Sequence, residues 1–93
     1  MKLTNHFRLM FWADSTHYKV WYDAGQIRRY GNHWLAATAT ETTWTTKPTR
    51  AAAVRHLCQR AIEETKTNPS APAWDKYVRG RARALLKRGG KLT

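Results

Sequence analysis

The chain has 93 residues, enough for one domain with a single modest core. Hydrophobic residues make up 42% and aromatic residues 12%, which excludes an intrinsically disordered chain. The formal charge of +11 predicts a polyanionic partner, with nucleic acid first and an acidic protein surface second. A single cysteine excludes an internal disulfide and indicates an intracellular, cytoplasmic protein. Since no segment approaches the roughly 20 apolar residues of a membrane span, we expect neither a signal sequence nor a membrane partner.

The first half of the chain alternates apolar and polar residues with the period of β-strands. Turns are predicted at residues 14–16 and 23–25, where Asp, Ser, Thr and Gly are concentrated. Because no helix-length segment separates the strands, the sequence predicts an antiparallel meander of three to four strands within residues 1–45. The predicted strands span residues 7–13, 17–22, 26–30 and 34–43.

The second half has the period of helices. Apolar residues at i, i+3, i+4 spacing predict a core helix within residues 47–67, with Cys58 buried on its apolar arc as a small hydrophobic residue. A linker at 68–72 leads to a second, basic helix at 72–88 and a flexible tail at 89–93. The predicted fold class is therefore α+β: an antiparallel three- to four-stranded meander followed by a packed helix and a basic C-terminal helix, all in one small domain.

Cations are concentrated in the C-terminal helix. Residues 71–93 hold seven Lys and Arg against one Asp, which accounts for +6 of the +11. At 100° per residue, four of these cations share one stripe that suits a phosphate backbone, and two more lie on the same helix. A solvated helix face and a helix lying on a membrane surface are the alternatives. The predicted binding residues of this helix are Lys76, Arg79, Arg83 and Lys87 on the stripe, and Arg81 and Arg88 beside it.

The first hairpin supplies a second candidate surface. Its alternation predicts that one side packs on the core helix and that the other side interleaves cations with aromatic rings, which suits stacked bases and phosphates, or equally a protein partner. The alternative is that the C-terminal helix folds across this side and buries both Trp residues. The candidate binding residues are Arg8, Trp12, Lys19 and Trp21, with Met10 and His17 beside them. The residues expected toward the helix are Phe7, Leu9, Phe11, Tyr18, Val20 and Tyr22, with Leu35, Ala37 and Ala39 from the last strand.

Residues for catalysis are scarce. The four His and one Cys follow no metal-ligand spacing, the six acids are scattered, and no nucleotide-binding glycine motif is present. We therefore predict no catalytic residue, no metal and no cofactor, and a binding protein in place of an enzyme. Three antiparallel strands followed by a helix is similar to the arrangement in the arm-binding domains of phage integrases and in plant AP2 domains, whose sheets enter the DNA major groove, although no diagnostic motif of either is present.

The sequence leaves two functions open. The first is nucleic-acid binding, with DNA and RNA not distinguished. The alternative is a small phage-type inhibitor, anti-CRISPR-like, that occupies the surface of a bacterial protein or defence complex. Both would use the same Arg and Trp residues, and the oligomeric state is not indicated by either.

Overall fold

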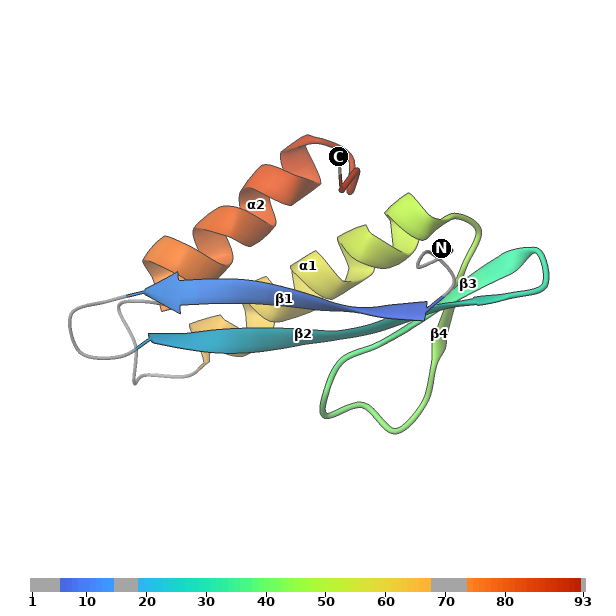
Figure 1. Cartoon of the computed structure of the whole chain (residues 1–93), viewed down its shortest axis with the longest axis horizontal. Helices are drawn as coiled ribbons and strands as arrows, with labels where there is room; N and C mark the ends of the chain where they lie inside the picture. The colour runs from blue at the N-terminus through green and yellow to red at the C-terminus, as the bar shows by residue number, and fades with distance from the viewer. Residues whose placement is uncertain (1–5, 15–18, 68–73, 93) are drawn as a thin grey trace.

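A computed structural model describes residues 6–14, 19–67 and 74–92 (Figure 1). It confirms the predicted α+β class, with a four-stranded antiparallel sheet followed by a helix and a C-terminal helix. His17, Tyr18 and the predicted linker at 68–72 lie outside the described residues. The strands lie side by side in chain order: β1 (His6–Asp14), β2 (Lys19–Tyr30), β3 (His33–Ala37) and β4 (Thr45–Lys47). The helices are α1 (Arg50–Lys66), the π-helical segment η1 (Trp74–Arg79), and α2 (Gly80–Lys87), which continues η1 directly.

The turn predicted at 23–25 is wrong, because β2 continues through it with a β-bulge. Leu9 pairs with Gly25 and Met10 with Asp23, so Ala24 is an extra residue of β2. The Asp23 carboxylate accepts a hydrogen bond from the Gly25 N–H at 3.0 Å. Gly25 has φ +129°, and a Cβ there would lie 2.3 Å from the Ala37 carbonyl oxygen. The bulge therefore requires glycine.

The long strand predicted at 34–43 is also wrong. β3 ends at Ala37, where the Thr38 N–H donates to the Glu41 side chain at 2.7 Å and a loop begins. The short strand β4 then pairs with β3, and this strand was not predicted. Ala36 lies opposite Ile27 and both are fully buried, whereas Ala39 is exposed. The small residue that lets the helix approach is Ala36, so the predicted alternation was shifted by one residue.

Both helices lie on the same face of the sheet (Figure 1). α1 contacts β2, β3 and β4, while η1 contacts β1. Strands are about 4.8 Å apart and a helix is about 10 Å wide, so one helix covers roughly two strands and a four-stranded face needs a second. The alternative in which the C-terminal helix covers the opposite face is wrong, because η1 and α2 complete the layer that α1 begins.

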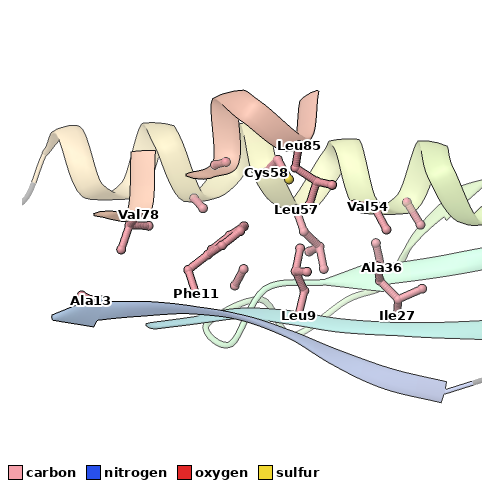
Figure 2. Packing of buried hydrophobic residues seen from close by; sticks show 14 residues of the cluster. Leu9, Phe11, Ala13, Ile27, Ala36, Val54, Leu57, Cys58, Val78 and Leu85 are labelled. Carbon is pink, nitrogen blue, oxygen red and sulfur yellow. The ribbon is translucent and has the colours of Figure 1, made fainter. Parts of the chain in front are cut away.

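The core lies between this sheet face and the helices (Figure 2). The side chains of Leu9 and Phe11 point from β1 toward the helices, and those of Leu57 and Val78 point from the helices toward the sheet, so all four are in one buried cluster. The predicted face is correct for these strand residues, although Val20 is 37% exposed. Cys58 is buried as predicted, and burial raises the pKa of its thiol to about 12. The thiol therefore stays protonated, and unreactive as a nucleophile, at neutral pH.

Local chemistry sets the helix ends. The Thr49 hydroxyl caps α1 by accepting the Ala52 N–H at 3.1 Å. After α2, the N–H groups of Gly89 and Gly90 donate to Leu86 and Leu85, both at 2.9 Å, with both glycines at positive φ. Arg55 of α1 donates to the Gly89 carbonyl at 2.8 Å. The first two residues of the predicted tail are thus bound to the helices.

Candidate binding surface

The sheet face turned away from both helices carries the side chains that the sequence predicted to gather there. Residues opposite each other in an antiparallel pair point to the same face. The structure thereby places Arg8, Trp12, Lys19 and Trp21 on one surface, as predicted. We call this surface the open face. In β1 and β2 it comprises His6, Arg8, Met10, Trp12, Asp14, Lys19, Trp21, Asp23, Gln26 and Arg28.

An aromatic pair forms one end of the open face. Trp12 and Trp21 lie directly opposite each other, and their ring centroids are 5.1 Å apart at an interplanar angle of 51°. Trp21 is 56% exposed, and the neighbouring Met10 is 39% exposed. Large apolar side chains are therefore left in water here, which is typical of a site that a partner covers.

The cations around the aromatic pair are neutralised. Arg8 forms an ion pair with Asp23, and the Lys19 ammonium lies 3.9 Å from the Asp14 carboxylate. The register places both acids on the open face together with their partners. The prediction of cations interleaved with aromatic rings was therefore incomplete, because it took no account of Asp14 and Asp23 on the same face.

The β2–β3 hairpin carries cations that the sequence analysis missed. Arg28 and Arg29 are exposed, Tyr30 is 70% exposed, and His33 follows the turn. Among the described residues, no carboxylate lies within 4.0 Å of either arginine. The Arg29 side chain donates to the Gly31 carbonyl at 3.2 Å. The hairpin projects past the helices in Figure 1. Two adjacent arginines before a Tyr-Gly-Asn turn were the sequence signal for this site.

The predicted stripe on the C-terminal helix is only partly present. The Arg79 side chain is 13% exposed, and its Nε donates to Asp75 at 3.1 Å. Arg83 lies 3.7 Å from the same carboxylate, and these two guanidinium groups lower the pKa of Asp75. The stripe is incomplete because η1 is a π-helix, whose i→i+5 hydrogen bonds do not keep the 100° step between residues.

The remaining cations of this helix point in different directions. Lys76 lies 5.5 Å from the centre of the Tyr77 ring, and Lys87 is exposed. Arg81 and Arg88 instead line a groove of about 330 Å³ between α2 and β1. The other residues that line this groove are Leu9, Met10, Phe11, Ala84, Leu85 and Leu92. The six predicted cations therefore do not form one surface. One is mostly buried (Arg79), three are exposed (Lys76, Arg83 and Lys87), and two line the groove beside β1 (Arg81 and Arg88).

Within residues 6–14, 19–67 and 74–92, no three His, Cys, Asp or Glu side chains gather as metal ligands. In this part of the chain, no helix is both long enough and apolar enough to cross a membrane. No family model, no curated protein and no solved structure matches the chain.

Proposed function

We propose that this protein is a non-enzymatic nucleic-acid-binding protein that uses the open face of its sheet and the β2–β3 hairpin. The observation that carries the proposal is that none of the described helices lies on the open face, which joins an exposed Trp21 to Arg28. Arg29 follows on the other face of the same hairpin, and among the described residues neither arginine has a carboxylate within 4.0 Å. Trp rings accept stacked bases of any sequence, and unpaired arginines take phosphates.

The spacing of these groups suits an extended strand of nucleic acid. Trp21 and Arg28 are both on β2, seven residues apart. Because Ala24 is an extra residue of the bulge, this run matches six residues of β1, which at about 3.3 Å per residue separates the two side chains by roughly 20 Å. Bases in a duplex are already stacked on each other, so a Trp platform favours single-stranded segments. We therefore assign the stacking role to Trp12 and Trp21, and the phosphate contacts to Arg28 and Arg29.

Titration of fluorescent single-stranded and duplex oligonucleotides at several salt concentrations tests this assignment. Trp21→Ala should weaken single-strand binding by about 1 to 3 kcal/mol. Trp44→Ala is the matched control, because Trp44 is 41% exposed and lies outside every strand. Arg28→Ala with Arg29→Ala should flatten the slope of log affinity against log salt by about 1.4 units, since each single-strand phosphate contact contributes about 0.7.

Two outcomes would contradict the proposal. An equal loss of slope in Lys76→Ala with Lys87→Ala would move the contact to the helix layer. Binding weaker than about 10⁻⁴ M to every oligonucleotide at physiological salt would remove nucleic acid as the partner, because non-specific binders usually reach that affinity.

A second candidate function, an inhibitor that occupies a protein surface, is favoured by the ion pairs of Arg8 and Lys19. They leave the surroundings of the Trp pair near neutral, as in the centre of many protein interfaces. Capture of one stoichiometric protein after nuclease treatment, with Trp12→Ala and Trp21→Ala each costing about 2 kcal/mol or more, would support this function. If Arg28→Ala and Arg29→Ala instead cost more binding energy than the two Trp substitutions, the inhibitor function would be contradicted.

A further inference from the structure

The edge of β1 and the groove beside it form a second site, which shares only Met10 with the open face. β1 is the first strand of the sheet order, so it pairs with β2 on one side and with no described strand on the other. A nine-residue edge strand leaves about four N–H and four C=O groups directed away from the sheet. These groups can pair with another extended chain.

The edge has few of the features that protect exposed strands. Proteins usually block such edges with proline, lysine, a bulge or a covering segment. β1 contains neither proline nor lysine, and the bulge of the first hairpin places its extra residue, Ala24, in β2. The backbone of β1 therefore continues as a strand with no extra residue past the groove, from Leu9 to Phe11, and its register with β2 shifts between Leu9 and Met10.

The groove indicates what chemistry the added chain has. Its floor is apolar, from Leu9, Phe11 and Leu85, and its helix side carries Arg81 and Arg88. Both arginines are exposed, and among the described residues neither has a carboxylate within 4.0 Å. Seven residues of helix separate them by about 10.5 Å, a span that long arginine side chains can match to acids two or four residues apart on a strand.

We propose that an extended acidic segment of a partner protein adds as a fifth strand along β1, with its carboxylates held by Arg81 and Arg88. Backbone pairing would supply affinity, and the alternating side chains would supply specificity. A second copy of this chain fits poorly, because each copy carries +11 and the repulsion opposes edge-to-edge pairing. This site is independent of the nucleic-acid proposal, which uses the open face and the hairpin.

The test uses a dye-labelled nine-residue peptide that alternates Glu and Val, with both ends blocked, titrated by fluorescence anisotropy into the full chain. Its control has the same sequence with methyl groups on its four central backbone nitrogens, which removes pairing and keeps the charge. We expect the methylated peptide to bind at least about tenfold more weakly, since strand addition depends on main-chain hydrogen bonds. Equal binding of the two peptides would overturn the proposal.

A pair of variants locates the contact. Arg81→Glu with Arg88→Glu should weaken peptide binding at least about tenfold, because like charges across an interface repel. Arg83→Glu with Lys87→Glu makes the same change in net charge on α2 away from the groove, and should have a much smaller effect. Equal losses in the two variants would show attraction to the whole helix and overturn the site.

Three further measurements separate this site from its alternatives. In an NMR titration the amide shifts of β1 should move, and those of the β2–β3 hairpin should not. Sedimentation should show a monomer, since a dimer that the peptide dissociates would make a second copy the occupant and overturn the proposal. Single-stranded oligonucleotide binding should be the same in the two charge variants, so that loss of peptide binding and loss of nucleic-acid binding are told apart.

Discussion

The same strands supply both faces of the sheet, because their side chains alternate between them. One face is covered by helices and the other faces solvent. On the covered face, Leu9, Phe11 and Ile27 are buried beneath α1, η1 and α2. On the open face, none of the described helices lies above Trp12 and Trp21, and Arg8 and Lys19 form ion pairs with acids of the same face. The difference shows that a large aromatic residue in a strand does not by itself indicate a core position. Whether such a residue is buried depends on the helices that cover its face, and here the described helices cover only one face.

The largest expected difference between the faces is in stability. Leu57 is fully buried above the covered face, so Leu57→Ala should reduce the free energy of unfolding by roughly 2 to 4 kcal/mol by leaving a cavity. Trp21→Ala removes a larger side chain from the open face and should cost less than about 1 kcal/mol, mainly the lost contact with Trp12. Urea unfolding of both variants makes the comparison. A greater loss for Trp21→Ala would show that the open face is covered in solution.

A smaller effect on stability is expected for Arg79, the mostly buried cation of the C-terminal helix. Arg79→Ala should destabilise by about 1 to 2 kcal/mol, because the mostly buried side chain loses packing as well as its pair with Asp75. Arg83→Ala removes a cation from the same carboxylate at an exposed position, and should change stability by less than about 0.5 kcal/mol. Equal effects of the two substitutions in thermal unfolding would refute the inward placement of Arg79.

The smallest effect concerns the loop after β3, where it meets α1 beside the covered face. The backbone N–H of Thr38 lowers the pKa of Glu41, and the nearby His56 lowers it further. The stability from this carboxylate is full above its unfolded pKa, and is lost as the pH falls through the folded pKa, because the unfolded chain binds the proton first. Glu41→Gln should therefore flatten the decline of the unfolding midpoint between about pH 5 and pH 3. An unchanged decline would exclude Glu41 as its source.

The sequence by itself determined the elements whose signal is local. The alternation of residues 7–13 predicted β1 and assigned its side chains to the correct faces, and the apolar arc containing Val54, Leu57 and Cys58 predicted α1. Period-two and period-3.6 patterns are properties of neighbouring residues, so they can be recognised without knowledge of the fold. The two Trp residues of the open face were predicted together for the same reason.

The tertiary structure decided everything that depends on residues distant in the sequence. Asp23–Gly25 has the composition of a turn, yet the chain continues as a strand there because Gly25 packs against the Ala37 carbonyl. The ion pairs of the open face depend on the register of β1 with β2, and the inward position of Arg79 depends on the π-helical turn. The groove lined by Arg81 and Arg88 exists because η1 and α2 lie on the β1 side of the covered face, beside α1, which contacts β2, β3 and β4. Pairing register and helix placement minimise the free energy of the whole chain, so no local window of sequence contains them.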